Sequence, residues 1–220
     1  MGSTFWNLDL VLLLRKPSRS TVDCFLQAQS RLAVTYPMVG ATVQLTEPPP
    51  NYVLDHTRIK VGAGEDAFRA GRVSLESWQQ FRLGWVEAIY ADTEIKAGGV
   101  VAVLASTFGV WWLNACRIVY VFDEPSPRRR FGFAYGTLPG HAESGEERFS
   151  IEWNQLDDSV WYDILAFSRP RHLLARLGYP LVRRMQKRFA RESASAMRSA
   201  VALALSGVPA KKVPGGKPWH

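Results

Sequence analysis

The sequence holds few of the residues that metal and redox sites require. Its 220 residues include two cysteines, Cys24 and Cys116, which form no short-spaced metal or redox motif. Both are expected to be buried thiols in a reducing compartment, which predicts a cytoplasmic protein. The chain has four histidines, His56, His141, His172 and His220, and none of them has a partner at metal-ligand spacing on a helix. We therefore expect no metal.

Nucleotide and secretion motifs are missing as well. The stretch Gly62-Ala63-Gly64 lacks the third glycine of a dinucleotide fingerprint, and no phosphate loop of the Walker type is present. The apolar run from Leu8 to Leu14 contains Asp9 and has no basic region before it, unlike a secretory signal. These observations predict a chain that uses no cofactor and carries no secretory leader.

Charge is absent from residues 97 to 116, between Lys96 and Arg117. A membrane-spanning helix needs roughly 20 apolar residues, so the length alone fits a span. The composition fits less well, because glycine, serine, threonine and asparagine interrupt the stretch and its apolar residues are mainly valine, alanine and tryptophan. Two strands at 100–105 and 110–121, joined by a turn at 106–109, explain it better.

Positive charge is in excess, with a formal net charge of +7. Much of it lies in Arg128-Arg129-Arg130 and between Arg169 and Arg198. A basic balance suits nucleic acid, an anionic membrane or an acidic partner. We favour a solvated helix face and a charged hairpin tip over nucleic-acid binding. Peripheral membrane contact is kept as an alternative, through Arg183, Arg184, Lys187 and Arg188.

Hydrophobic periodicity predicts an α+β protein. Two shorter helices are expected in the N-terminal half, from Ser20 to about Tyr36 and from Glu65 to Phe81. Short connections predict antiparallel neighbours among the strands that follow residue 100. These strands are expected at 100–105, 110–122, 131–137, 148–153 and 160–167. A long, basic, amphipathic helix then begins near Pro170 or Pro180 and ends near Leu205.

One strand has an unusually bare face. Because side chains alternate between faces, one side of residues 131–137 carries aromatic rings and the other only Gly132, Ala134 and Gly136. Glycine weakens a strand and often marks a close approach. We expect the C-terminal helix to cover this bare face as a lid, with a bulge or a ligand as alternatives.

Several residue strings resemble those of uncharacterised protein family 0548, a domain-of-unknown-function family. They include Tyr36 with Val39-Gly40-Ala41-Thr42, Arg117-Ile118-Val119-Tyr120, Phe131-Gly132-Phe133-Ala134-Tyr135-Gly136-Thr137-Leu138-Pro139-Gly140-His141, and Ala166-Phe167-Ser168-Arg169-Pro170. The resemblance runs from about Tyr36 to Val201, so Phe5 to Thr35 lies outside it. It implies a plan similar to the helix-grip (START-like) proteins, in which a curved antiparallel sheet wraps around a long C-terminal helix and encloses an apolar cavity. It implies no established reaction.

We therefore predict one domain over 36–205, with residues 1–35 as a lead strand and helix of the same domain and 206–220 as a flexible tail. The leading hypothesis is a module that binds a small apolar molecule, with or without an acidic group, between the sheet and the C-terminal helix. A cyclase, dehydratase or isomerase that uses the same cavity is the second hypothesis, and a membrane-peripheral protein is the third.

The candidate site residues follow from these hypotheses. A histidine beside carboxylates suits proton transfer, which makes His141 and Glu147 the catalytic candidates. An inward-pointing arginine in an apolar strand must be paired and suits an anionic ligand group. Aromatic residues suit an apolar cavity wall. The ligand-binding candidates are Arg58, Trp78, Trp85, Arg117, Tyr120, Phe133 and Tyr135.

Overall fold

A single antiparallel sheet forms the frame of the molecule. The computed structural model describes residues 11–89, 94–125, 128–171 and 177–207. The sheet has eight strands in this part of the chain: β1 (Val11–Leu13), β2 (Val53–Ala63), β3 (Val86–Ile89), β4 (Val100–Thr107), β5 (Val110–Glu124), β6 (Arg128–Thr137), β7 (Glu143–Asn154) and β8 (Ser159–Pro170). Seven of them follow the order β2-β8-β7-β6-β5-β4-β3. The short β1 pairs with residues 111–113 of β5. Strand β6 pairs with β5 only from Cys116 onward, so β1 and β6 pair with different parts of β5.

The uncharged stretch forms the hairpin of β4 and β5, as the composition predicted. Its turn passes through Phe108 and Gly109, both with positive φ, which is the backbone that a tight antiparallel hairpin prefers. In the described part of the chain, no helix combines the length and the apolar character that a membrane crossing requires. The absence of charge from residues 97–116 is therefore explained by a pair of strands with apolar faces.

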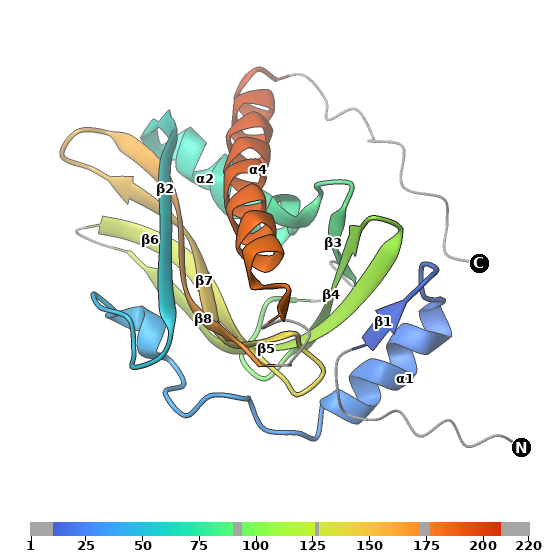
Figure 1. Ribbon diagram of the computed structural model, residues 1–220. Helices are drawn as coiled ribbons and strands as arrows, with labels where there is room; N and C mark the ends of the chain where they lie inside the picture. The colour runs from blue at the N-terminus through green and yellow to red at the C-terminus, as the bar shows by residue number, and fades with distance from the viewer. Residues whose placement is uncertain (1–10, 90–93, 126–127, 172–176, 208–220) are drawn as a thin grey trace, which may run out of the picture.

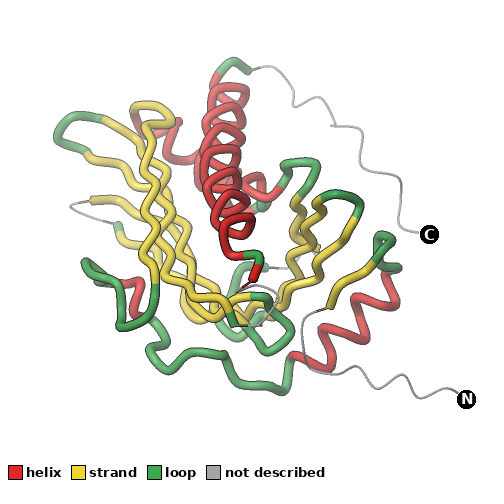
Figure 2. Tube along the Cα trace, in the orientation of Figure 1, coloured by secondary structure: helices red, strands yellow, loops and turns green. Residues whose placement is uncertain are grey.

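The long helix α4 (Tyr179–Leu205) lies in the concave side of the curved sheet, as Figures 1 and 2 show. It begins beside the second of the two candidate prolines, and Pro180 occupies the first turn, where its missing N–H costs no helical hydrogen bond. Helix α2 (Gly64–Glu76) packs beside it. Met197 and Val201 from α4 join one core cluster with Phe68 from α2 and with Phe133 from the sheet. The predicted class, α+β with a curved antiparallel sheet around a long C-terminal helix, is confirmed.

The other face of the sheet carries helix α1 (Arg19–Gln29), which Ser18 caps through its side chain. Val22 and Phe25 of α1 pack on Leu104 and Leu113 of the β4–β5 hairpin. Two 3₁₀ turns complete the described elements, η1 (Ala41–Val43) and η2 (Gln79–Phe81). The helix predicted from Ser20 is therefore present, although it ends at Gln29 and well short of Tyr36.

Both cysteines are free thiols, but only one is buried. Cys116 lies in the core, whereas Cys24 is exposed on α1, so the expectation of two buried thiols is wrong for Cys24. The predicted tail at 206–220 is described only for Ser206 and Gly207, and the rest of it lies outside the described residues.

The bare face of β6 is covered by Tyr36 at Gly136 and by Phe122 at Gly132, and not by the C-terminal helix. A Cβ at Gly136 would overlap the ring and hydroxyl of Tyr36, which comes from the segment before β2. Helix α4 instead lies on the aromatic side of β6, in the core cluster that holds Phe133 and Tyr135. The prediction of a helical lid on the glycine face is wrong. The physical reason is that the ring of Tyr36, which comes from a segment distant in sequence, occupies the space left by the missing side chain of Gly136.

Candidate functional site

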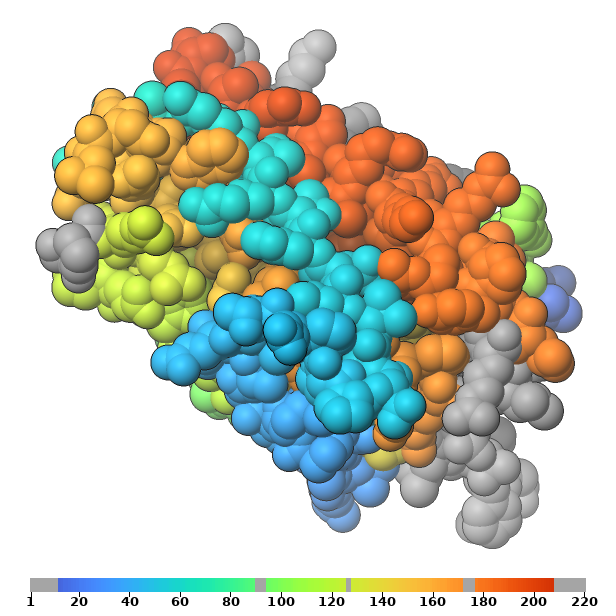
Figure 3. All heavy atoms as spheres, turned by 60° about the vertical axis from the view of Figure 1, so that its left-hand side comes forward, coloured from blue at the N-terminus to red at the C-terminus, as the bar shows by residue number. Residues whose placement is uncertain are grey.

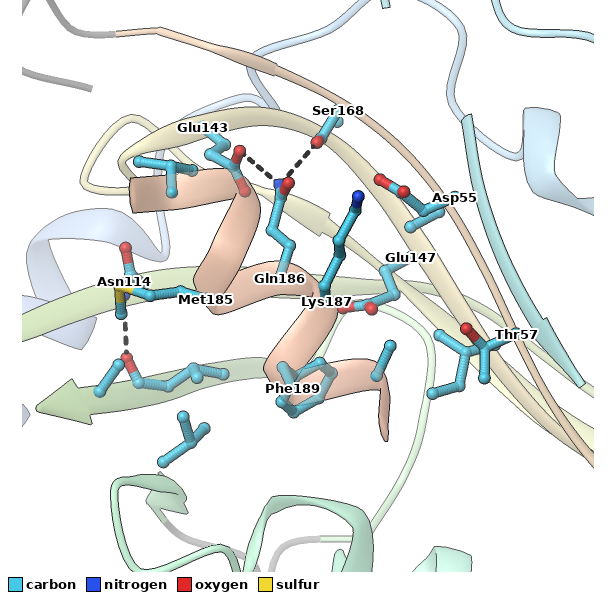
Figure 4. Close-up of a pocket in the computed structure, with 18 of the residues that line it drawn as sticks. Asp55, Thr57, Asn114, Glu143, Glu147, Ser168, Met185, Gln186, Lys187 and Phe189 are labelled. Carbon is cyan, nitrogen blue, oxygen red and sulfur yellow. Dashed lines mark hydrogen bonds between the residues drawn. The ribbon is translucent and has the colours of Figure 1, made fainter. Parts of the chain in front are cut away.

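A cavity of about 690 Å³ separates the concave face of the sheet from α4. Its walls are mostly apolar and aromatic, and they include Ile59, Phe81, Trp85, Val103, Ile164 and Phe189. This volume lies within the range of about 300 to 1,000 Å³ that small-molecule pockets occupy. Figure 4 shows the region where α4 passes over β7 and β8. The cavity is the natural place to look for a ligand.

Strand alternation brings two carboxyl groups into this cavity. Because β7 already begins at Glu143, residues 143–147 are part of this strand, which the sequence predicted only from residue 148. Glu143 and Glu147, four residues apart, therefore share the cavity face, and both line the cavity. Glu146 is buried, and its carboxylate bonds to Tyr36 and Thr42 on the opposite face. The three glutamates at the start of β7 therefore lie on two sides of the sheet, with Glu143 and Glu147 on the cavity side and Glu146 on the other.

Glu147 forms a hydrogen-bonded pair with Tyr135, its cross-strand neighbour on β6. The Tyr135 hydroxyl donates to Glu147 Oε2 at 2.7 Å. Burial raises the pKa of Glu147 to about 7, the hydrogen bond from Tyr135 opposes the rise, and the negative charges of Glu143 and Asp55 add to it. Burial also raises the pKa of Tyr135 well above its usual range. Glu147 is therefore a carboxyl group that gains and loses its proton near neutral pH.

A polar network joins α4 to the sheet at one end of the cavity. Arg183 donates to both oxygens of Asp55 on β2, at 2.5 Å and 2.7 Å, and to Gln186 at 2.6 Å. Gln186 in turn donates to Glu143 Oε1 at 2.6 Å and to Ser168 Oγ at 3.1 Å, as Figure 4 shows. Burial raises the pKa of Glu143, and the hydrogen bond from Gln186 opposes that rise. Figure 3 shows β2 and α4 side by side on the surface that this network connects.

The catalytic candidate His141 also lines the cavity. Its Nδ1 accepts a hydrogen bond from the backbone N–H of Glu143 at 3.0 Å, so the ring is held at the start of β7. Trp85 lines the cavity from the loop before β3, and its indole N–H donates to Glu192 at 2.7 Å. The guanidinium of Arg188 stacks 4.4 Å from the centre of the Trp85 ring. The structure therefore gathers His141, Glu147, Tyr135 and Trp85 around one cavity.

Two aromatic candidates belong to the core instead. Trp78 and Phe133 are almost fully buried, and their ring centres lie 5.0 Å apart. Neither is among the residues that line the cavity. They support its wall from behind, in the core cluster that also contains Phe81.

The three remaining candidates lie on the outer face of the sheet, away from the cavity. Arg58 donates to Glu152 and Asp163, and Arg117 donates to the backbone oxygen of Ser30 at 2.7 Å. Tyr120 is hydrogen-bonded to Thr42 at 2.7 Å. The expectation that they share a ligand site with Tyr135 is therefore not met. For Tyr120 the cause is a bulge, because the β5–β6 register shifts between Ile118 and Tyr120 and changes the face on which Tyr120 lies.

The basic residues considered for membrane contact are partly engaged within the protein. Arg183 is tied to Asp55, and Arg188 pairs with Glu192 at 2.8 Å. Arg184 and Lys187 are exposed, and Lys187 reaches the lining of the cavity. Within the described ranges, His, Cys, Asp and Glu side chains form no group of three or more that is suited to hold a metal ion.

Comparison with known proteins identifies the family. Residues 35–196 match the family described as a domain of unknown function (DUF1990). A UPF0548 protein of Dictyostelium discoideum is 34% identical over 203 residues, which cover 85% of this chain and 94% of that protein. A UPF0548 protein of Deinococcus radiodurans is 33% identical over 195 residues, which cover 84% and 96%. The chain belongs to the UPF0548 family.

Solved structures of similar plan share little sequence with this UPF0548 chain. The crystal structure of Ara h 8.0201 is 11% identical, covers 69% of this chain and 98% of its own, and has a TM-score of 0.44. A point mutant of norcoclaurine synthase from Thalictrum, in complex with a transition state analogue, is 12% identical, covers 71% and 96%, and has a TM-score of 0.41. Similarity this remote transfers no activity.

The residue strings that resemble the family form a buried network on the outer face. Glu146 accepts hydrogen bonds from the Tyr36 hydroxyl at 2.7 Å, from the Gly40 N–H at 2.7 Å, and from both the N–H and the hydroxyl of Thr42. Arg148 donates to the backbone oxygen of Thr42 at 2.7 Å. In this UPF0548 chain, the network anchors the segment before β2 onto the sheet.

Asp55 and Arg183 form an ion pair that the sequence did not predict, because the two residues lie 128 positions apart. In the sequence, Arg183 is only one of several basic residues of the C-terminal helix. No local pattern identifies such a pair, because the contact exists only once α4 lies against β2.

Proposed function

We propose that this protein binds a small, largely apolar molecule in the cavity between the sheet and α4. The observation that carries the proposal is the cavity itself, whose volume of about 690 Å³ suits a small ligand and whose lining is mainly apolar. The few polar groups on its walls are positioned by strands and by α4, as expected of a site that orients its ligand. Its family relationship is compatible with this function and supplies no reaction.

The polar group of the ligand is better matched by the cavity walls than by the arginines first considered. Arg58 and Arg117 are engaged on the outer face, so neither offers a positive charge to an acidic ligand group inside. The polar groups that line the interior wall from the sheet include Asp55, Tyr135, Glu143 and Glu147. We therefore propose that the ligand is mainly apolar and that its polar group contacts side chains of β6 and β7.

A pair of matched substitutions on α4 tests this function. Ala190 lines the cavity, whereas Ala202 is exposed on the same helix and does not line it. Binding of the uncharged fluorescent probe N-phenylnaphthylamine is expected for the wild type and for Ala202→Trp. The Ala190→Trp side chain occupies the cavity and should weaken binding by at least about tenfold, since it displaces the ligand from apolar surface. Equal binding by both variants, with unchanged thermal unfolding, would refute the cavity as the site.

Catalysis in the same cavity is a second candidate, favoured by the Glu147–Tyr135 pair. A carboxyl with a pKa of about 7 is suited to exchange protons near neutral pH, as a cyclase, dehydratase or isomerase requires. Mass spectrometry of molecules extracted from wild-type and Glu147→Gln protein distinguishes the two functions. Turnover predicts that the variant retains an unconverted molecule that the wild type lacks, whereas binding alone predicts the same molecule in both.

A further inference from the structure

The cavity wall that the sheet provides is rich in carboxyl groups and poor in positive charge. Asp55, Glu143 and Glu147 all line it. Only Asp55 has an ion-pair partner among the described residues, because Arg183 holds both of its oxygens. The hydrogen bonds recorded for Glu143 and Glu147 come from neutral groups, the amide of Gln186 and the hydroxyl of Tyr135. The positive charge of Arg183 also acts on Glu143, so among the described residues Glu147 is the carboxyl group of this wall on which no positive charge acts.

Lysine and arginine side chains reach the lining from α4, and two histidines, His56 and His141, reach it from the sheet side. Lys187, Arg191 and Arg198 line the cavity and are exposed to solvent, so they lie at its rim. Solvent screens such exposed charges more than it screens the partly buried Glu147. The interior wall and the rim thus differ in sign, with the acidic groups inside.

The electrostatic environment of Glu147 favours a cation. Nearby charges act on Glu147 from Glu143 and Asp55, and both raise its pKa. These two negative charges add to burial, which is the largest cause of the raised pKa. Removing a carboxylate from solvent is costly, so Glu147 carries a proton below its pKa of about 7. A positively charged ligand group can replace that proton.

Aromatic rings surround the same space. Phe81 lies with its ring centre 5.2 Å from that of Phe189 and 6.2 Å from that of Tyr135, and all three line the cavity. The Trp85 ring already accepts a guanidinium, that of Arg188, on one face. Ring faces attract cations, and the combination of aromatic faces with a carboxylate is suited to an ammonium group.

We propose that the ligand is an apolar molecule with a basic nitrogen, bound with its ammonium group on the carboxylate of Glu147. This inference rests on the proposed function and adds the chemical class of its ligand. Tyr135 positions the carboxylate by donating to Oε2, which leaves the remaining lone pairs of the carboxylate for the ligand. The aromatic walls hold the apolar part. Binding displaces the proton of Glu147, so it is linked to pH.

Several titratable and charged groups lie near Glu147 on the neighbouring elements. They are Asp55 and His56 on β2, Cys116 on β5, Tyr135 on β6, His141 and Glu143 at the start of β7, Tyr162 on β8, and Arg183 and Lys187 on α4. Burial raises the pKa values of Cys116, Tyr135 and Tyr162 well above neutrality, so these three groups stay protonated there.

Three probes with one apolar body test the proposal: naphthylethylamine, naphthylethanol and naphthylacetate. Calorimetry above the pKa of Glu147 should show the amine bound at least about tenfold more tightly than the alcohol or the acid. The Glu147→Gln variant should lose about tenfold to a hundredfold in affinity for the amine, the range expected for a charge-assisted hydrogen bond, and little for the alcohol. Glu94→Gln is the matched control, because the Glu94 side chain is 80% exposed.

The pH profile gives a second, independent measurement. Affinity for the amine should rise as the pH rises through the pKa of Glu147, with proton release on binding. Tyr135→Phe removes a hydrogen bond that lowers this pKa, so it should move the rise to higher pH. If the alcohol or the acid binds as tightly as the amine, or if amine affinity falls over this range, the amine proposal is wrong while the cavity function stands. If the three probes and N-phenylnaphthylamine all fail to bind, the proposed function itself fails.

Discussion

The raised pKa of Glu147 makes a sharp prediction about stability. In the folded protein the pKa of Glu147 is about 7, whereas an ordinary glutamate has a pKa of 4.5. Below 4.5 the group is protonated in both the folded and the unfolded chain. As pH rises toward 7, only the unfolded chain loses the proton readily, so the stability linked to Glu147 declines and is fully lost above 7. At about 1.4 kcal/mol per pH unit, the loss is about 3 kcal/mol.

The Glu147→Gln substitution removes this dependence. Glutamine keeps the size of the side chain and an oxygen that accepts from Tyr135, but it does not titrate. Urea unfolding of both proteins from about pH 4.5 to about pH 8 gives two stability curves, and their difference isolates Glu147. We expect the variant to gain about 3 kcal/mol relative to the wild type across this range. Any cost of burying the amide is the same at each pH and drops out of the comparison.

Parallel curves for the two proteins would refute the reasoning, because they would mean that Glu147 has the same pKa in both states. A Glu76→Gln variant serves as the control. The Glu76 carboxylate is partly exposed on α2, where it pairs with Arg72 at 3.0 Å, and it lies outside the cavity. Its curve should follow that of the wild type.

Three further substitutions test contacts that hold the fold around the cavity. Arg183→Gln breaks the pair with Asp55 and should lower the free energy of unfolding by about 1 kcal/mol, since both side chains are partly solvated. Gly136→Ala places a methyl group against the Tyr36 ring and should cost about 2 kcal/mol through overpacking. Tyr36→Phe removes one donor from the buried Glu146 and should cost about 2 kcal/mol, as expected for a hydrogen bond to a charged group. Chemical denaturation measures all three.

Matched variants provide the controls for these measurements. Arg184 is exposed, so Arg184→Gln should change stability little. Tyr52→Phe loses only a long hydrogen bond of 3.4 Å to Ser144 and should be milder than Tyr36→Phe. A double-mutant cycle between Arg183 and Asp55 that shows no coupling would contradict the role given to that pair. A neutral Gly136→Ala would contradict the close approach of Tyr36.

Much of the fold was predictable because its signals are local. The uncharged stretch predicted the β4–β5 hairpin through its glycines and its short apolar runs, and Pro180 marked the start of α4 closely. Strand ends were predicted less well, since β7 begins at Glu143 and the apolar pattern begins only near Arg148. Charged residues can extend a strand when backbone pairing to β6 and β8 continues, and composition does not show such pairing.

Only some of the predicted site residues line the cavity. Tyr135, His141 and Glu147 line the cavity as their neighbourhood in the sequence suggested, whereas Arg58, Arg117 and Tyr120 lie on the outer face. A strand pattern shows that residues two apart share a face, but it does not show which face is inside.

The sequence by itself determined the bare glycine face of β6 and the amphipathic C-terminal helix. Each is a property of residues within a few positions of one another. Only the tertiary structure decided which face α4 covers, that Tyr36 packs against Gly136, that Arg183 pairs with Asp55, and that Glu147 accepts a hydrogen bond from Tyr135. These outcomes depend on contacts between segments far apart in the chain, whose geometry exists only after the sheet has curved around the helix.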